Sequence, residues 1–371
     1  MDFDFSPDQE QLRDAVRKYV SKAYTFERRS AIVKAGGFDR AAYQELAELG
    51  LTGLNISDTY DGMGMGPVES LVVMEEMGRG LVLEPLAQSM IGGVILETQA
   101  GDALKKAWLP RIASGEAMVV LAYQERKARY ALDQCAAVAT ANGNAYSING
   151  TKNVVATASE AAAFLVPATL NGKLALFVVE NNTPGVSTTA YSTQDGARAG
   201  DVTLHNAVAQ LVTPEGQSAL ELAVDIGITA TCAYAVGVMD KTMAATVEYM
   251  NTRKQFGVLI SSFQALRHRM ADMKMQLELA RSMAYFAALK MGESAPARRR
   301  ALAQAKYQVG QSMRSIGQGA VQLHGGIGVT DEYIVSHYFK TLTQLEMSFG
   351  DSMHHLGEVT SRMQDTAGVF A

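Results

Sequence analysis

The chain has 371 residues, of which 48% are hydrophobic and 19% charged, and its formal net charge is −5. This is the composition of a globular protein with room for two or three structural units, and it argues against extended disorder. An acidic balance without a basic block also argues against nucleic acid and anionic membranes as partners.

The first region, up to about residue 112, is predicted to be helical. Ser6 and Pro7 suit the N-cap and first turn of a helix, and apolar residues then recur three and four positions apart. The N-terminus, MDFDFSPDQEQL, lacks the basic and apolar runs of an export signal. The most apolar stretch, GLVLEPLAQSMIGGVIL, contains Glu84, Pro85 and Gln88 and is too short for a membrane span. We therefore expect a cytoplasmic protein without membrane insertion.

Between Met118 and about Val212 the pattern changes to short runs rich in valine, alanine and threonine. Glycine, asparagine or proline separates these runs at intervals of roughly ten residues, which is typical of an antiparallel sheet or barrel. The two cysteines, Cys135 and Cys232, have no CxxC or CxxH neighbours. Neither a disulfide framework nor a cysteine-based metal site is therefore expected.

Long helices return from Ser218 onward. The clearest is predicted to begin after Ser262 as N-cap and to place a stripe of apolar side chains on one face. This stripe consists of Phe263, Leu266, Met270, Met273, Leu277, Ala280 and Ala284. A helix of about 30 residues suits a bundle or a subunit interface. The six histidines form no HxxxH or HExxH motif, so we expect no metal site.

Two short motifs carry more specific chemistry. TRKQFG, residues 252–257, follows one long helix and offers a planar cation for a pyrophosphate and an aromatic face. QLHGGIGVTDEY, residues 322–333, ends the helix that begins near Ala301, and its paired glycines allow a ligand to approach backbone amides. Each motif alone is equally compatible with a helix cap or a tight interhelical turn.

Together with the order helix, β, helix, the two motifs make the whole chain resemble the acyl-CoA dehydrogenase family. The resemblance implies an N-terminal helical domain (1–117), a middle β domain built as an antiparallel barrel or sandwich (118–212), and a C-terminal four-helix bundle (213–371). It also implies FAD at a dimer interface and α,β-desaturation of an acyl-CoA thioester, in which a carboxylate removes the α proton while the β hydrogen leaves as hydride. By the resemblance, eight residues of this chain would bind the adenine half of an FAD that is shared with a second chain. Matched residue by residue, they are Arg253, Gln255, Phe256, Gly257, Gln264, Gln322, Gly325 and Gly326.

The sequence departs from the family pattern in three places. AYQERKARYALDQ, near Tyr123, lacks the small residues of the family's T-E-P-x-A-G-S-D type loop. GTKNVVAT has Val154 and Ala156 where the family's G-T-K-x-W-I-T has tryptophan and threonine. Counted without gaps from Glu332, the catalytic glutamate of the family's Y-E-G-T segment falls on Phe349.

Two acids near the usual base positions are candidate bases. Glu346 precedes Phe349 by three residues and shares its neighbourhood if the helix continues, and Asp225 lies two residues from Gly227, where some family members carry the base. A solvated or ion-paired acid is the plainer role for both. The departures from the family pattern therefore affect the residues that would contact the flavin ring and remove the proton, whereas the residues matched to adenine binding are present.

This pattern favours the small subunit of a heteromeric, α2β2 acyl-CoA dehydrogenase of the pimeloyl-CoA or steroid side-chain type. Its partner chain would supply the base and the flavin pocket, and family resemblance implies an electron-transferring flavoprotein as acceptor. Two alternatives stay open: a self-sufficient homomeric dehydrogenase that uses Glu346 or Asp225, and a non-catalytic acyl-CoA-binding or scaffolding protein on the same fold. The FAD content of the purified chain separates the self-sufficient enzyme from the other two.

Overall fold

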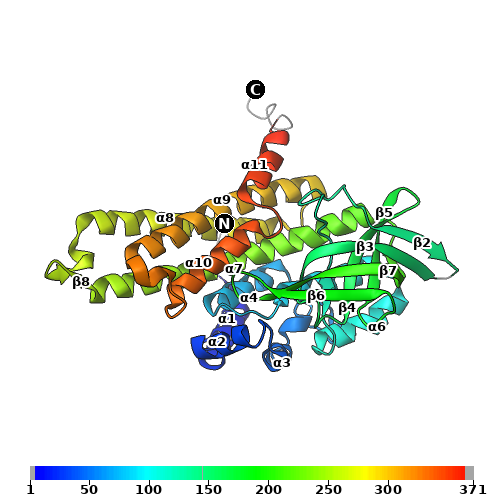
Figure 1. The fold of residues 1–371 in the computed structure, drawn as a ribbon, viewed down its shortest axis with the longest axis horizontal. Helices are drawn as coiled ribbons and strands as arrows, with labels where there is room; N and C mark the ends of the chain where they lie inside the picture. The colour runs from blue at the N-terminus through cyan, green and yellow to red at the C-terminus, as the bar shows by residue number, and fades with distance from the viewer. Residues whose placement is uncertain (1–4, 144, 364–371) are drawn as a thin grey trace. The chain divides into compact units, whose positions relative to one another are not determined.

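The structure is a computed structural model that describes residues 5–143 and 145–363. Its elements follow the predicted order of helices, strands and helices (Figure 1). The N-terminal helices are α1 (Pro7–Ala23), α2 (Phe26–Lys34), α3 (Arg40–Glu48), α4 (Pro67–Arg79), α5 (Leu86–Gln99) and α6 (Asp102–Ala113). The strands that follow are β1 (Val119–Leu121), β2 (Val138–Asn142), β3 (Ala145–Ala156), β4 (Ala163–Leu170), β5 (Lys173–Glu180), β6 (Val186–Ser192) and β7 (Arg198–Thr213). The remaining elements are α7 (Gly216–Thr252), β8 (Lys254–Gln255), β9 (Val258–Leu259), α8 (Gln264–Lys290), α9 (Ala295–His324), the 3-10 helix η4 (Gly325–Val329), α10 (Ile334–Met347) and α11 (Ser352–Ser361).

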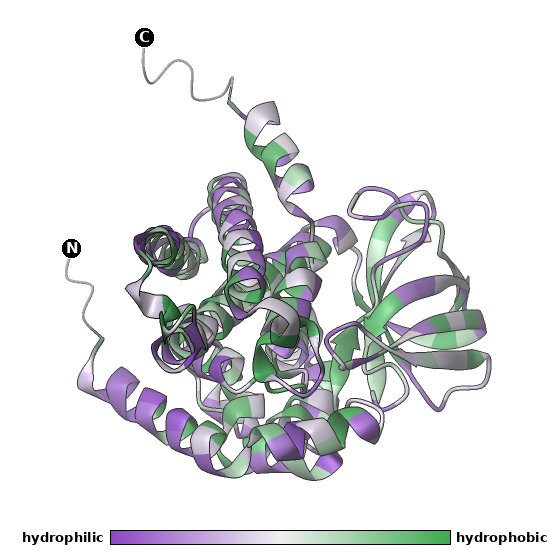
Figure 2. Cartoon of the chain, turned by 60° about the vertical axis from the view of Figure 1, so that its left-hand side comes forward, coloured by the Kyte–Doolittle hydropathy of each residue, from purple (hydrophilic) through white to green (hydrophobic). Residues whose placement is uncertain are grey.

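The predicted start of α1 is confirmed. The Ser6 hydroxyl accepts a hydrogen bond from the Gln9 amide (3.3 Å), and the Gln9 side chain accepts one from the Ser6 amide (3.0 Å), which is a complete capping box. Figure 2 shows α1 as hydrophilic along most of its length, and its buried residues are Val16 and Val20. A narrow apolar stripe therefore attaches this helix to its neighbours.

The seven strands β1–β7 form one sheet that closes on itself. The ladders β4–β2, β2–β3, β3–β7, β7–β5 and β5–β4 make a five-stranded ring, with β1 added beside β4 and β6 beside β7. This confirms the barrel, although β1 and β2 run parallel to β4 and the sheet is therefore not wholly antiparallel. Its core is apolar and includes the fully buried Ile148, Phe164, Phe177 and Val202.

Contacts divide the chain into two compact units that do not follow chain order. The first joins α1 and α4 to the helices from residue 228 onward, and the second contains residues 31–66 and 83–227, including the barrel. The domain boundaries after residues 117 and 212 stay a prediction.

Within the first unit, α4 and α7 cross at two glycines. A Cβ atom on Gly78 would lie 2.0 Å from Tyr234 O, and one on Gly237 would lie 1.9 Å from Glu75 O. Both distances are far below van der Waals contact, so the two backbones approach as closely as they do because neither position has a side chain.

The stripe predicted for α8 is buried in its second half. Met273, Leu277, Ala280 and Ala284 are buried. The predicted cap is wrong: the N-cap is Phe263, and the Ser262 hydroxyl donates to Leu259 O (2.6 Å) within a 3-10 turn. The helix also begins two residues after Ser262.

The helix that by length and apolar composition comes nearest to a membrane span is α7, not the stretch singled out from the sequence. By length and composition, α7 could cross a membrane, whereas residues 80–96 do not form such a helix. However, 89% of the most apolar window of α7 is buried inside the protein, as in the core helix of a soluble protein.

Candidate functional site

The TRKQFG motif forms a hairpin at one end of the bundle (Figure 1). β8 and β9 pair in antiparallel fashion, and the turn between them consists of Phe256 (φ 52°) and Gly257 (φ 80°). Positive φ at both central residues is the geometry of a two-residue type I′ turn, which suits glycine and strains phenylalanine. Phe256 is 91% exposed, and Arg253 beside the hairpin is exposed as well. The motif therefore presents a cation and an aromatic face to solvent.

The second motif lies where α9 ends. Gly325 has φ 64° and begins η4, and Gln322, Gly325 and Gly326 are exposed. Apart from the adjoining backbone, no heavy atom of the described residues would lie within 4 Å of a Cβ atom built on Gly325 or Gly326. The backbone at these glycines is thus open to a ligand, as the sequence predicts, and Gln264 is exposed at the start of α8.

Tyr249 and His324 bring the two motifs together. Their rings stack with centroids 4.4 Å apart, and the Tyr249 hydroxyl donates to His324 O (3.3 Å). Tyr249 lies one helical turn before Arg253, whose amide donates to Tyr249 O (2.8 Å), and His324 directly precedes Gly325. Sequence reasoning missed this contact, although both residues lie within or beside the quoted motifs.

His324 is a buried, neutral member of this contact. Burial lowers the pKa of its imidazole. Its Nδ1 lies 2.8 Å from Ala320 O, and because a carbonyl can only accept, Nδ1 carries the proton. The stacked rings of Tyr249 and His324 thus join α7 to α9, and the neutral imidazole adds no positive charge to that of Arg253.

The predicted base position lies at the opposite end of α10. The 14 residues of α10 span about 20 Å, from beside Tyr333 to the turn at Phe349. In this turn Phe349 has φ 56° and Gly350 has φ 107°. A phenyl ring can accept no proton, so the side chain at this position provides no general base.

Neither candidate acid is placed as a free base. α10 ends at Met347, so the helix does not continue from Glu346 to position 349. The Glu346 carboxylate accepts the Ser352 amide (3.0 Å) and lies 3.5 Å from Arg314 Nη2. Asp225, in α7, is 1% exposed.

The segment matched to the family's flavin-facing strand lies in β3. Val154 has φ 54°, a conformation that a β-branched residue rarely adopts, and its amide donates to the Tyr191 hydroxyl (3.1 Å) and to Asp201 (3.2 Å). Lys152 is fully buried, with Nζ 2.6 Å from Glu125 Oε1. Glu125 also accepts hydrogen bonds from the amides of residues 136 and 137, so these contacts anchor residues 124–126 to the barrel.

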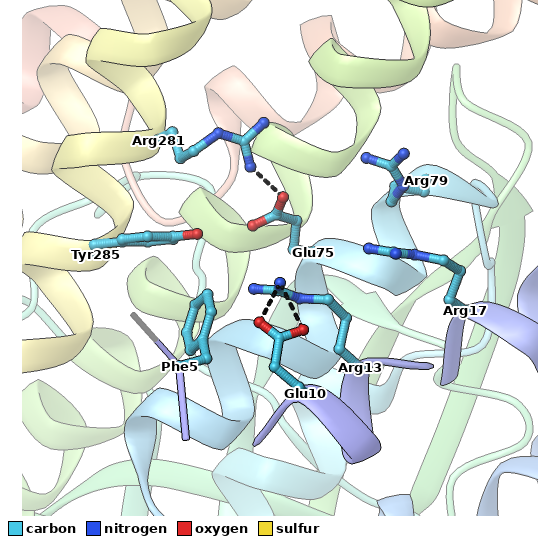
Figure 3. A pocket seen from close by; sticks show the side chains of 8 residues that line it. All are labelled: Phe5, Glu10, Arg13, Arg17, Glu75, Arg79, Arg281 and Tyr285. Carbon is cyan, nitrogen blue, oxygen red and sulfur yellow. Dashed lines mark hydrogen bonds and ion pairs between the residues drawn. The ribbon is translucent and has the colours of Figure 1, made fainter. Parts of the chain in front are cut away.

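A polar pocket of about 500 Å³ lies among α1, α4 and α8 in the first unit (Figure 3). It is lined by Phe5, Glu10, Arg13, Arg17, Glu75, Arg79, Arg281 and Tyr285. Each lining arginine pairs with a carboxylate of the same unit, through the pairs Arg13–Glu10, Arg17–Glu76, Arg79–Asp240 and Arg281–Glu75. Burial raises the pKa of Glu75, and Arg281 opposes this rise. These pairs describe an ionic network that joins helices, and we assign no ligand to the pocket.

Three family models together match nearly the whole chain. They describe the acyl-CoA dehydrogenase N-terminal domain (residues 6–116), middle domain (120–207) and C-terminal domain (216–364). The chain is 31% identical over 350 residues to the acyl-CoA dehydrogenase fadE12 of Mycobacterium tuberculosis, covering 89% of each chain. It is 28% identical over 370 residues to the probable acyl-CoA dehydrogenase YngJ of Bacillus subtilis, covering 95% of this chain and 97% of that relative. A solved structure described as the ChsE4-ChsE5 complex from M. tuberculosis is similar at 26% identity with a TM-score of 0.91, covering 99% of this chain and all of that one.

Proposed function

Because the chain belongs to the acyl-CoA dehydrogenase family of oxidoreductases, we propose that it acts in FAD-dependent α,β-dehydrogenation of an acyl-CoA thioester as one subunit of a heteromeric complex. The observation that carries the proposal is the division of the site. The residues matched to FAD binding are exposed where α7 and α9 end, whereas the base position, about 20 Å away along α10, holds Phe349. A partner chain would supply the base.

The residues at the bundle end suit the adenine and pyrophosphate of FAD by their chemistry. Arg253 offers a forked set of N–H donors for a diphosphate, and the open backbone at Gly325 and Gly326 offers amides. Phe256 offers an exposed ring face. FAD, when bound, accepts the hydride from the β carbon of the acyl group. Exposure of all these groups on a single chain supports an FAD that is shared with a second chain.

The absence of a base at position 349 supports the heteromeric assignment. The α proton of a thioester is weakly acidic, so its removal needs a carboxylate placed against it. The contacts of Glu346 with Ser352 and Arg314 favour a structural role for that acid, and the burial of Asp225 disfavours direct access to a substrate. The similar ChsE4-ChsE5 structure is itself described as a complex of two chains. We propose a cytoplasmic enzyme of fatty acid or steroid degradation, with an electron-transferring flavoprotein as acceptor.

FAD content tests the proposal. The chain is purified alone and after co-expression with a second acyl-CoA dehydrogenase chain encoded nearby, and bound FAD is measured per chain by absorbance. We expect little FAD on the chain alone and full occupancy of the complex, whose flavin an acyl-CoA then reduces. Full FAD occupancy together with acyl-CoA-dependent flavin reduction by the chain alone would overturn the proposal in favour of a self-sufficient enzyme. A complex that binds acyl-CoA without ever reducing flavin would favour a scaffolding protein.

A further inference from the structure

Lys306 of α9 is fully buried, and its ammonium group binds three backbone carbonyls. Nζ lies 3.0 Å from Leu345 O, 2.8 Å from Glu346 O and 2.9 Å from Gly350 O. All three N–H donors of the ammonium group are thereby used. Burial lowers the pKa of Lys306 to about 8, because a charge at this depth is unfavourable. The charged form of Lys306 therefore carries a desolvation cost, which its three hydrogen bonds offset in part.

The three carbonyls flank the turn that carries position 349. Two lie at the C-terminal end of α10, where a cation is favoured by the helix dipole, and the third, Gly350 O, lies within the turn directly after Phe349. The turn itself is strained, since a non-glycine residue such as Phe349 in the left-handed region costs about 1–2 kcal/mol.

Other contacts hold the same turn from a second side. His355 Nε2 donates to Phe349 O (3.0 Å), and the Glu346 carboxylate accepts the Ser352 amide (3.0 Å). The Asp351 side chain accepts the His354 amide (2.8 Å) at the start of α11. Strained backbone that several independent contacts over-determine is typical of ligand-facing segments.

We infer that Lys306 is a positioning residue that fixes the turn at residues 348–351 as a wall of the acyl-thioester site, an inference that rests on the proposed function. The ammonium group ties the end of α10 to Gly350 and so sets where position 349 faces. The same contacts make Glu346 part of the support of the turn. Position 349 itself carries no base, but the turn in which the family carries it is held here by several hydrogen bonds.

The test uses the full chain in its FAD-binding complex and compares Lys306→Met with Lys152→Met. Lys152 is the matched control because it is also fully buried but lies in the barrel, paired with Glu125. Hydrogen exchange of peptides covering residues 345–356 reports the turn, and titration with butyryl-, octanoyl- and palmitoyl-CoA reports the site.

We expect Lys306→Met to raise exchange in residues 345–356 and to weaken acyl-CoA binding, each by roughly tenfold or more, since small misplacements in a binding site have large effects. Lys152→Met should lower the Tm while exchange in residues 345–356 stays at the wild-type rate. Unchanged exchange in Lys306→Met, or a loosened turn with unchanged acyl-CoA affinity, would overturn the positioning role. A wild-type complex that binds neither FAD nor any of these acyl-CoAs would instead overturn the proposed function.

A second variant tests the turn if Lys306→Met does not fold. In Gly350→Ala the new Cβ atom would lie 2.6 Å from ring atoms of His354 and His355, so the turn must shift while Lys306 stays in place. Gly357→Ala in α11 is its control, because within the part of the chain that the structure describes no atom outside the adjoining helix backbone lies within 4 Å of that Cβ. We expect weaker acyl-CoA binding in Gly350→Ala and unchanged binding in Gly357→Ala, and equal affinities in both variants would refute the inference.

Discussion

Replacing Gly237 by alanine should destabilise the protein even though alanine is the better helix former. The added Cβ atom would lie 1.9 Å from Glu75 O and 2.9 Å from Arg79 N, both backbone atoms of α4. To reach ordinary contact the two helices must separate by about 1.5 Å or more, and overpacking of this kind costs about 1–3 kcal/mol. Because neither obstructing atom belongs to a flexible side chain, we expect a cost near 3 kcal/mol. The gain in helix propensity is about 1 kcal/mol, so a net loss of about 2 kcal/mol in the free energy of unfolding should remain.

Urea unfolding followed by circular dichroism measures this loss. The control is Gly357→Ala, a helical glycine with open space around its Cβ position, which should gain up to about 1 kcal/mol from propensity alone. If Gly237→Ala is as stable as the wild type or gains as much as the control, then the close crossing of α4 and α7 is not the constraint described above. The free energies of the three proteins can be compared directly if the slope of the free energy of unfolding against urea concentration is the same in all three.

Three further predictions concern the charged groups. Arg253→Gln should weaken FAD binding to the complex by roughly 10–100-fold, because charge-assisted hydrogen bonds contribute about 1.5–3 kcal/mol. Lys254→Gln, at the neighbouring exposed residue, is the control and should have little effect. If an FAD titration shows similar losses of affinity in both variants, the role of Arg253 is contradicted. Glu125→Gln should lower the free energy of unfolding by about 3 kcal/mol or more, since it leaves the Lys152 ammonium group buried without the carboxylate that neutralises it. Calorimetry that shows no decrease in the Tm of this variant would refute the prediction. Burial raises the pKa of Glu125, but the hydrogen bond and charge of Lys152 and the hydrogen bonds from the amides of residues 136 and 137 together lower it from its ordinary value of 4.5. The pair should therefore contribute fully above about pH 4.5 and lose its contribution as the pH falls through the lowered pKa; a Tm difference between wild type and Glu125→Gln that does not shrink on acidification would contradict this sign.

Local signals predicted the fold well where they are strong. The N-cap at Ser6 was predicted because Ser6 and Pro7 are adjacent in the sequence and suit a helix start, and the structure adds the reciprocal contact of Gln9. The change from helical to strand periodicity near Met118 likewise locates the barrel. Ser262 failed as a cap because a 3-10 turn precedes α8, and its hydroxyl bonds within that turn. The parallel ladders of β4 were also missed, since periodicity reports strands but not their direction.

The candidate site was predictable as motifs but not as geometry. The sequence placed Arg253 and Gly325 in conspicuous segments, yet nothing in it joins Tyr249 to His324 across 75 residues. The strands of the hairpin at Phe256 are two residues long, too short for any periodic signal. The support of position 349 by Lys306 was also missed, because a lysine in a helical pattern reads as a solvated residue.

The scattered origin of the first compact unit has a consequence during synthesis. α1 is among the first segments made, but the compact unit to which it belongs also contains α8, and the Phe5 ring just before α1 lies 5.6 Å from the ring of Tyr285 in α8. At translation rates of roughly 5–20 residues per second, α1 must wait on the order of 10–50 s for that partner to leave the ribosome. A helix that buries little beyond Val16 and Val20 is suited to wait in water without aggregating. Chains that stop within the barrel therefore cannot assemble the first unit, and the nascent protein gains its bundle late in its synthesis.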